Sequence, residues 1–406
     1  MKVMQINCVY NTGSTGKIMY DIHSELINNG IESVMCYGRG AKTQEKNVYK
    51  TSSEFSAKFY NVISRFTGMP YSGSIPETVR LINIIKKEKP DVVHIHCING
   101  FFVNIYKLIT FLKKHRIPTV LTHHAEFMYT GNCGHAFECN KWKNGCGNCP
   151  SLKQATGSLI FDCTKSNFNK MKKAFDGYGD LYSVAVSPWV KSRAEKSPVF
   201  ADKNNKVILN GIDDKVFKPY DDANDLREQL KIDEDKKIIV HVTASFNNKD
   251  KGGMFIIDLA ERLKNDAIIL IIGNSAPMQN IPENIIALGR IENRVDLAKY
   301  YSLADLSVIT SKRETFSMPV AESLCCGTPV IGFEAGGPES VALDEYSEFV
   351  EFGSADKLYE CAIKWLNKKA TLSEISDNAR KYYSKTRMAQ AYIELYKKYL
   401  DKDESL

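Results

Sequence analysis

The sequence predicts an α/β protein of two domains, each built on a parallel, doubly wound sheet. Its 406 residues exceed what one hydrophobic core usually serves. A buried strand, a glycine-containing loop and a helix follow one another at the N-terminus, and the same order returns at residue 237. Strands then alternate with helical segments, which favours parallel pairing. We expect a domain over 1–190, a second over 191–385, and a helix over 386–406 that packs back on the first.

The charge is unevenly distributed between the two halves. Residues 1–190 carry 23 Lys and Arg against 13 Asp and Glu, whereas residues 191–406 carry 31 against 35. A basic first half favours an anionic partner, such as a membrane surface or a phosphorylated acceptor. Nucleic acid is the competing partner, and we rank it lower because no nucleic-acid-binding module is recognised.

The apolar content of 43% and charged content of 25% are ordinary for a soluble globular protein. The apolar N-terminal stretch is too short for a signal peptide, and nowhere do eighteen apolar residues run together. We therefore expect a cytoplasmic protein. Most of the eleven cysteines fit reduced thiols better than a disulfide framework.

The N-terminal segment reads as a strand over 1–10, a loop from Asn11 to Lys17, and a helix ending near Gly30. A P-loop is excluded, because its first glycine would fall at Asn11 and Ile18 follows Lys17. Gly13 and Gly16 either let the backbone approach a ligand closely or make a tight turn.

A second strand over 31–37 is followed by a stripe of apolar residues at helical spacing, with Lys58 and Arg65 among them. The stripe consists of Phe55, Phe59, Val62, Ile63 and Phe66. Two interpretations stay open: the stripe packs on the core, or it lies on a membrane surface together with the basic segment 107–116.

Two further strands, over 90–96 and 117–124, end in histidines. The carboxyl ends of strands in open α/β sheets are where ligands bind. His96, His123 and His124 are therefore candidates, although a lone histidine is more often a core residue.

Four cysteines lie within the segment 130–150, which we expect to be an insertion. Their spacing closes with C-x2-C and suits tetrahedral Zn²⁺ in a structural site. The expected ligands are Cys133, Cys139, Cys146 and Cys149. Disulfides and free thiols are the alternatives, and no catalytic metal is expected.

The second half opens with a strand over 237–243 and a loop that leads through Lys251 and two glycines into a helix. A lysine at such a turn can neutralise a diphosphate leaving group. Strands over 267–273, 285–289 and 305–310 follow. A tail over 379–400 with tyrosines at helical intervals predicts a helix.

Glu314 and Glu322 stand eight positions apart, with Pro319 suited to a first helical turn. Carboxylates accept paired hydrogen bonds from vicinal hydroxyls, so the two could hold a sugar and a ribose. The backbone N–H groups of Phe316, Ser317 and Met318 offer a place for phosphate between them. Two unrelated glutamates beside an amphipathic helix are the alternative.

The run 313–332 (R-E-T-F-S-M-P-V-A-E-S-L-C-C-G-T-P-V-I-G) resembles the signature of the retaining glycosyltransferases of family 4. N-G-I-D at 210–213, A-G-G-P-E at 335–339 and P-T-V-L-T-H-H at 118–124 resemble further segments of that family. The resemblance implies the GT-B arrangement: two facing Rossmann-like domains, with acceptor bound mainly by the first and nucleotide sugar by the second.

The resemblance also implies roles for residues. Glu314, His124 and Lys251 would be catalytic, with Glu314 on the donor-sugar hydroxyls, His124 facing the donor sugar and Lys251 on the diphosphate. The donor-binding residues would be Glu322, Gly13, Gly16, Asn210, Arg313, Phe316, Ser317 and Met318. Two positions depart from the family: Ala125 stands where many members have aspartate, and Ser245 where an arginine is expected. Lys249 or Arg313 is the candidate to compensate.

The implied function is transfer of a sugar, with retention, from a UDP- or GDP-sugar to a lipid-linked saccharide in cell-surface polysaccharide biosynthesis. The cysteine-rich insertion resembles one in a subset of capsular and lipopolysaccharide enzymes, which would work at the cytoplasmic face of a membrane. A nucleotide-sugar epimerase and a non-catalytic sugar-nucleotide-binding regulator are the alternatives. An NAD dehydrogenase is disfavoured, because no G-x-G-x-x-G with a downstream ribose acid is present.

Overall fold

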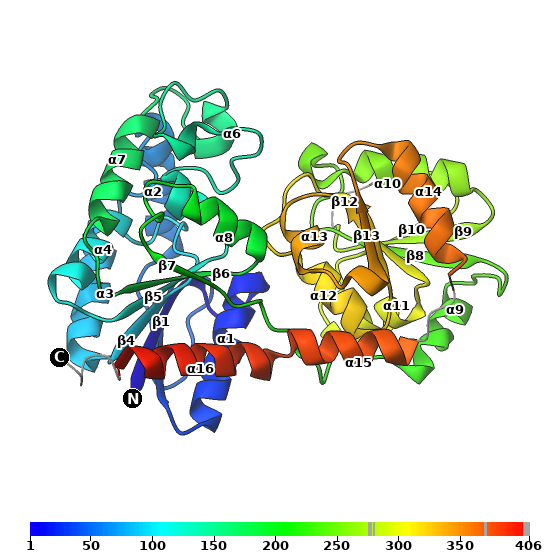
Figure 1. The fold of residues 1–406 in the computed structure, drawn as a ribbon, viewed down its shortest axis with the longest axis horizontal. Coiled ribbons are helices and arrows are strands. Elements are labelled where there is room, and N and C mark those ends of the chain that lie inside the picture. The colour runs from blue at the N-terminus through cyan, green and yellow to red at the C-terminus, as the bar shows by residue number, and fades with distance from the viewer. Residues whose placement is uncertain (275–277, 279–280, 369–371, 401–406) are drawn as a thin grey trace. The chain divides into compact units, whose positions relative to one another are not determined.

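The computed structural model describes residues 1–274, 278, 281–368 and 372–400. The chain divides into two compact units (Figure 1): the first unit begins at Met1, ends at Leu209 and resumes at Met388, and the second unit is Asn210–Arg387. The expected boundary after residue 190 lies too early. Strand β7 (Asn204–Val207) pairs with β6 (Leu181–Ala185), so the chain completes the first sheet before it leaves it.

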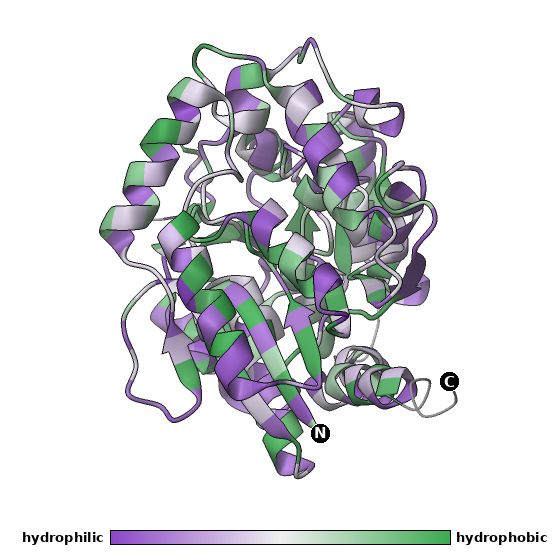
Figure 2. Cartoon of the chain, turned by 90° about the vertical axis from the view of Figure 1, so that its left-hand side faces the viewer, coloured by the Kyte–Doolittle hydropathy of each residue, from purple (hydrophilic) through white to green (hydrophobic). Residues whose placement is uncertain are grey.

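The first unit contains a seven-stranded sheet of order β3-β2-β1-β4-β5-β6-β7 in which all pairs are parallel. Its other strands are β1 (Lys2–Val9), β2 (Glu32–Arg39), β3 (Val48–Lys50), β4 (Val92–Ile95) and β5 (Thr119–His123). β4 and β5 are buried along their whole length, which requires helices on both faces of the sheet. In Figure 2 the helices mix hydrophobic and hydrophilic residues, as amphipathic helices do.

The helices of the first unit connect these strands. They are α1 (Gly13–Asn28), α2 (Glu54–Thr67), α3 (Ile75–Glu88), α4 (Ile105–Lys114), α5 (Phe127–Thr130), α6 (Leu152–Thr156), α7 (Thr164–Phe175) and α8 (Pro188–Glu195). α1 begins at Gly13, so the loop expected over residues 11–17 is shorter than predicted. Within the described part of the chain, no helix combines the length and the apolar character needed to cross a bilayer.

The second unit contains a six-stranded parallel sheet of order β10-β9-β8-β11-β12-β13. Its strands are β8 (Lys237–Val242), β9 (Ala267–Ile272), β10 (Ile285–Gly289), β11 (Leu306–Ile309), β12 (Val330–Phe333) and β13 (Ser347–Val350). Its helices are α9 (Asp225–Gln229), α10 (Gly253–Leu263), α11 (Arg294–Leu303), α12 (Met318–Cys325), α13 (Gly337–Val341), α14 (Ala355–Leu366) and α15 (Leu372–Tyr383). The parallel, doubly wound arrangement predicted for both halves is confirmed.

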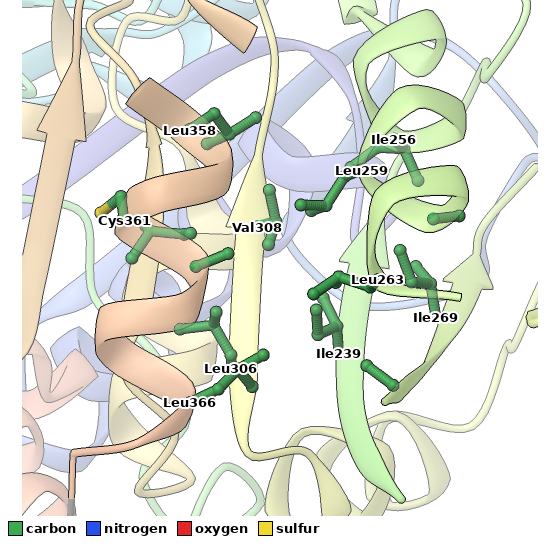
Figure 3. Packing of buried hydrophobic residues seen from close by; sticks show 14 of the residues in the cluster. Ile239, Ile256, Leu259, Leu263, Ile269, Leu306, Val308, Leu358, Cys361 and Leu366 are labelled. Atoms are coloured by element: carbon green, nitrogen blue, oxygen red, sulfur yellow. The ribbon is translucent and has the colours of Figure 1, made fainter. Parts of the chain in front are cut away.

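One core cluster of the second unit fixes the helix that follows Lys251. Figure 3 shows Leu259 of α10 and Leu358 of α14 reaching toward Val308 of β11, and all three side chains are at most 1% exposed. Burial of each such aliphatic side chain contributes about 1.5–3 kcal/mol. The packing of α10 therefore fixes the position of its own N-terminus and of the loop that precedes it.

The C-terminal tail differs from the single helix expected over 379–400. α15 ends at Tyr383 and α16 (Lys385–Leu400) begins two residues later. The backbone N–H of Ile212 donates to the Tyr383 carbonyl (2.6 Å), and the N–H of Lys385 donates to the Ile212 carbonyl (2.9 Å). An extended segment thus takes backbone hydrogen bonds that a continuous helix would have used, and the helix breaks at Ser384.

Candidate functional site

In the second unit, two of the predicted catalytic residues lie together. Nζ of Lys251 is 2.6 Å from Oε1 of Glu314, and the side chains are 34% and 23% exposed. Glu314 follows β11; its N–H donates to the Ala335 carbonyl (3.1 Å), and its carbonyl accepts from the N–H of Gly337 (2.9 Å). The loop after β11 thereby presents a carboxylate to the lysine of the loop after β8.

The position of Lys251 depends on the glycines that follow it. Lys251 ends a short 3-10 turn (Lys249–Lys251), and its carbonyl accepts from Oγ1 of Thr310 (2.9 Å). Gly252 has φ +69°, and a Cβ there would lie 2.2 Å from the Thr310 carbonyl oxygen. Only glycine fits this left-handed position against β11, so the K-G-G sequence fixes the lysine beside Glu314.

The turn at 335–337 packs against the other side of the Glu314 segment. Glu339 accepts hydrogen bonds from the N–H groups of Ala335 (2.9 Å) and Gly336 (2.6 Å), which holds the turn in place. A Cβ at Gly337 would lie 2.5 Å from the Thr315 carbonyl carbon. The glycines therefore allow two loops to approach closely and keep Glu314 in position.

Helix α12 begins at Met318, and its N-cap is strained. Ser317 has φ 74° and ψ 88°, the left-handed region, and its side chain makes no capping hydrogen bond. A non-glycine residue there costs roughly 1–2 kcal/mol. Such outliers cluster at ligand-binding sites. Phe316 is 2% exposed and packs edge-on against Tyr383, so its side chain is part of the core.

Glu322 lies in the second turn of α12. Its Oε2 accepts a hydrogen bond from the Tyr301 hydroxyl (3.4 Å), and burial raises the pKa of that phenol, so Tyr301 stays a donor. Asn210 is buried at the start of the second unit. Ser245 and Lys249 are exposed on the loop after β8, whereas Arg313 is half-buried directly before Glu314.

In the first unit, two of the three predicted histidines lie together. His96 follows β4 and His124 follows β5; Nδ1 of His96 is 3.1 Å from Nε2 of His124. Nε2 of His96 is 3.0 Å from Oε1 of Gln5. Because the amide oxygen accepts, His96 carries its proton on Nε2 and accepts from Nε2–H of His124. His123 instead contacts Ser183 (2.9 Å) and packs edge-on against Phe200, as a core residue does.

The sequence did not single out His94 and two tyrosines of α16 that extend this network. Nδ1 of His94 is 2.6 Å from the Tyr396 hydroxyl, and Nε2 is 2.8 Å from Oγ1 of Thr122, which contacts the Tyr392 hydroxyl at 2.9 Å. The rings of His94 and His96 lie 3.9 Å apart. The sequence did contain one signal for His94: it lies two residues before His96, and residues two apart along a strand lie on the same face of the sheet.

The histidines of this cluster are neutral near pH 7. Burial lowers the pKa of His124 to about 4 and that of His123 to about 3. Burial also lowers the pKa of His94 and His96 well below the usual value. His124 can therefore act as a neutral hydrogen-bonding dipole, but not as an acid with a pKa near neutrality.

The two N-terminal glycines have different surroundings. Gly13 has φ +62° with open space where a Cβ would lie, which fits a tight turn into α1. A Cβ at Gly16 would lie 3.0 Å from Cγ2 of Val9, so Gly16 lets α1 pack closely on β1. Donor binding by the two glycines stays a prediction.

The four cysteines of the insertion are free thiols in the structure. In the described residues, no three or more His, Cys, Asp or Glu side chains are grouped so as to hold a metal ion. Burial raises the pKa of Cys133 and of Cys146 to about 12. This arrangement does not fit the expected zinc site, and no step below involves a metal.

Two family models match the chain. Residues 222–382 match the model described as "Glycosyl transferases group 1", and residues 15–144 match "Glycosyltransferase Family 4". The putative colanic acid biosynthesis glycosyl transferase WcaC of Escherichia coli K12 is 22% identical over 98% of this chain and 99% of its own. N-acetyl-alpha-D-glucosaminyl L-malate synthase of Bacillus anthracis is 24% identical over 44% of this chain and 49% of its own.

Solved structures share the fold over nearly the whole chain. Sucrose-phosphate synthase from Thermosynechococcus elongatus matches with a TM-score of 0.70 at 16% identity, covering 99% of each chain. HepE of Anabaena in complex with UDP-glucose matches with a TM-score of 0.67 at 14% identity, covering 100% of each chain. These similarities identify the GT-B fold expected from the sequence.

Proposed function

We propose that the protein transfers a sugar from a UDP- or GDP-sugar to a lipid-linked saccharide, with retention of the anomeric configuration, in cell-surface polysaccharide biosynthesis. The chain belongs to the family 4, group 1 glycosyltransferases and is a hexosyltransferase-type enzyme. The observation that carries this proposal is the Lys251–Glu314 pair. It joins a cation for a diphosphate to a carboxylate for sugar hydroxyls, beside the glycine turn at 335–337.

The second unit supplies the charged residues that we propose to bind the donor. On donor binding, Lys251 exchanges Glu314 for the diphosphate, and the backbone N–H groups at the start of α12 add donors to the phosphate oxygens. Glu314 then accepts hydrogen bonds from sugar hydroxyls, and Glu322, oriented by Tyr301, accepts from the ribose. The proposed donor-binding set further includes Gly13, Gly16, Asn210, Arg313, Phe316, Ser317 and Met318.

Retention follows from these roles. Glu314 is engaged with sugar hydroxyls, so it is not free to attack the anomeric carbon. The acceptor hydroxyl attacks that carbon from the side of the leaving group, the bond from the carbon to the diphosphate oxygen breaks, and the departing diphosphate takes the hydroxyl proton. Lys251 stabilises the charge that develops on the diphosphate, and neutral His124 supports the positive charge that develops on the sugar.

The acceptor and the location are proposed from the similarity to WcaC, a putative colanic acid biosynthesis enzyme. A growing surface polysaccharide is carried on lipid, so the reaction would take place at the cytoplasmic face of a membrane. HepE, whose structure was solved with UDP-glucose, supports a uridine donor as the first to test.

The experiment has two stages. A thermal-shift screen against UDP-, GDP- and ADP-sugars should select one donor, because a ligand that binds the native state raises the melting temperature. An NMR time course with that donor and saccharide acceptors should then show a product of unchanged anomeric configuration. An inverted product, or a glycosyl adduct on Glu314, would overturn the mechanism; donor turnover to an epimer without acceptor would overturn the transferase assignment.

A further inference from the structure

Helix α2 directs its apolar side chains away from the core. Of its 14 residues only Ala57 and Ser64 are buried. The exposed stripe is Phe55 (81%), Phe59 (53%), Val62 (53%), Ile63 (38%) and Phe66 (51%). Positions i, i+4, i+7, i+8 and i+11 share one side of a helix. Packing of this stripe on the core is therefore excluded.

A second apolar segment lies against the C-terminal end of this helix. Leu159, Ile160 and Phe161 are 44%, 58% and 58% exposed. The N–H of Leu159 donates to the Arg65 carbonyl (2.7 Å), and a Cβ at Gly68 would lie 2.4 Å from the Phe161 carbonyl oxygen. We refer to the eight side chains of α2 and this segment as the apolar ridge.

The ridge is a concentration of apolar surface, not a random scatter. It holds half of the sixteen large hydrophobic side chains that are exposed in the described residues. Contiguous exposed apolar patches mark interaction surfaces, whereas single exposed side chains need no explanation.

Basic cavities adjoin the apolar ridge. Lys165, Lys170 and Lys173 of α7 line a cavity of about 560 Å³, with Asp162 as its acidic residue. Sγ of Cys163, also in this lining, donates to the Thr67 carbonyl (3.3 Å), which ties the cavity to the end of α2.

A second cavity of about 560 Å³ shares Lys170 and adds Lys107 and Lys114 of α4. Five lysines thus line two cavities that share Lys170, and the first of these cavities lies beside the end of α2. This arrangement offers an apolar surface for acyl chains and cations for the phosphates next to them.

We propose that the apolar ridge and these lysines form a docking face for an anionic phospholipid bilayer. A helix with one apolar stripe lies in the plane of a membrane with that stripe at the acyl boundary, and lysines beside it bind the anionic headgroups. A second copy of the chain fits less well, because a twofold axis through the ridge would bring the lysines of α7 toward their own copies. The inference rests on the proposed function only in that a lipid-linked acceptor requires the enzyme at a membrane.

Vesicle co-sedimentation of the full chain tests the docking face without donor or acceptor. The protein should bind phosphatidylcholine vesicles that contain phosphatidylglycerol, bind pure phosphatidylcholine more weakly, and lose binding as salt rises. The variant Phe55→Ser/Phe59→Ser/Ile160→Ser should bind the vesicles more weakly than the wild type by at least roughly tenfold. Lys170→Ala/Lys173→Ala should bind roughly 20- to 30-fold more weakly and show a weaker salt dependence, because three of the five lysines remain.

Matched controls come from exposed residues elsewhere in the first unit. Ile27→Ser (54% exposed, α1) and Lys397→Ala/Lys398→Ala (α16) should bind like the wild type. Circular dichroism establishes that each variant is folded. Equal binding by the ridge variants and the wild type would overturn the proposal.

Analytical sedimentation distinguishes a membrane from a second copy of the chain as the partner of the ridge. A wild-type dimer that becomes monomeric in the ridge variant and does not bind vesicles would assign the ridge to a second copy and overturn the membrane proposal. Vesicle binding by a protein that transfers no sugar would leave the docking face standing and overturn the proposed function instead.

Discussion

The ion pair between Lys251 and Glu314 gives the sharpest test of the proposed site. Replacing Lys251 by alanine removes the charge that we assign to the diphosphate. Loss of one preorganised charge-stabilising donor costs about 2–4 kcal/mol in the transition state, so kcat/KM should fall roughly 30- to 1,000-fold.

The effect on folding should be far smaller. The two side chains are 34% and 23% exposed, and ion pairs that reach solvent contribute about 0–1 kcal/mol to stability. Lys251→Ala should therefore lower the free energy of unfolding by no more than about 1 kcal/mol. The contrast between the two magnitudes distinguishes a residue of the reaction from one that only supports the loop.

Initial rates with the donor chosen by thermal shift, and urea unfolding of the same preparations, measure both quantities. Lys357→Ala is the matched control, because Lys357 pairs with Glu351 at 3.6 Å on an exposed surface of the same unit. The control should change neither quantity appreciably. Near-wild-type kcat/KM for Lys251→Ala would refute the reasoning, as would a loss of stability as large as the loss of transition-state stabilisation.

Three further predictions concern the second unit. Glu314→Gln should lower turnover more than donor affinity, whereas Glu322→Gln should chiefly weaken nucleotide binding; calorimetric titration beside initial rates measures both, and the reverse pattern would exchange their roles. Ser317→Gly should have a free energy of unfolding, measured in urea, about 0.5–1 kcal/mol higher than Ser317→Ala, because relief of left-handed strain exceeds the entropy cost of glycine; equal free energies would contradict this. Burial lowers the pKa of His241 to about 4, so this histidine binds a proton more readily in the unfolded chain than in the folded one. The free energy of unfolding should therefore fall by about 3 kcal/mol in total as the pH is lowered from 6.5 toward 4. Urea unfolding of His241→Gln over that range should show a weaker dependence of this free energy on pH.

The repeated order of strand and helix was enough to predict two parallel sheets, because buried parallel strands are short apolar runs with glycine turns. It missed β3, whose three half-buried residues give almost no periodic signal. It also joined α15 to α16, because the hydrogen bonds of Ile212 that break the helix come from far along the chain. Such long-range pairing leaves no local pattern in the sequence.

The sequence allowed those site residues to be predicted whose role can be read from residue type and spacing. Glu314 and Lys251 could be named, but their 2.6 Å contact depends on Gly252 packing against β11. His124 could be named from its strand end. Gln5 and His94, which contact its partner His96, could not, since they come from interior positions of two other strands. The spacing of the cysteines predicted a zinc site that their arrangement does not provide.

The return of α16 to the first unit has a consequence for biosynthesis. The second unit is one continuous stretch, but the first is finished by residues from Met388 onward, which the ribosome makes last. Until then Thr122 and His94 lack the tyrosine hydroxyls that satisfy them in the folded unit. A nascent chain that stops before Met388 should therefore hold a completed second unit and an incomplete, aggregation-prone first one. A premature stop codon just before Tyr392 removes both hydroxyls, whereas one just after Tyr396 leaves both in place and should be tolerated better.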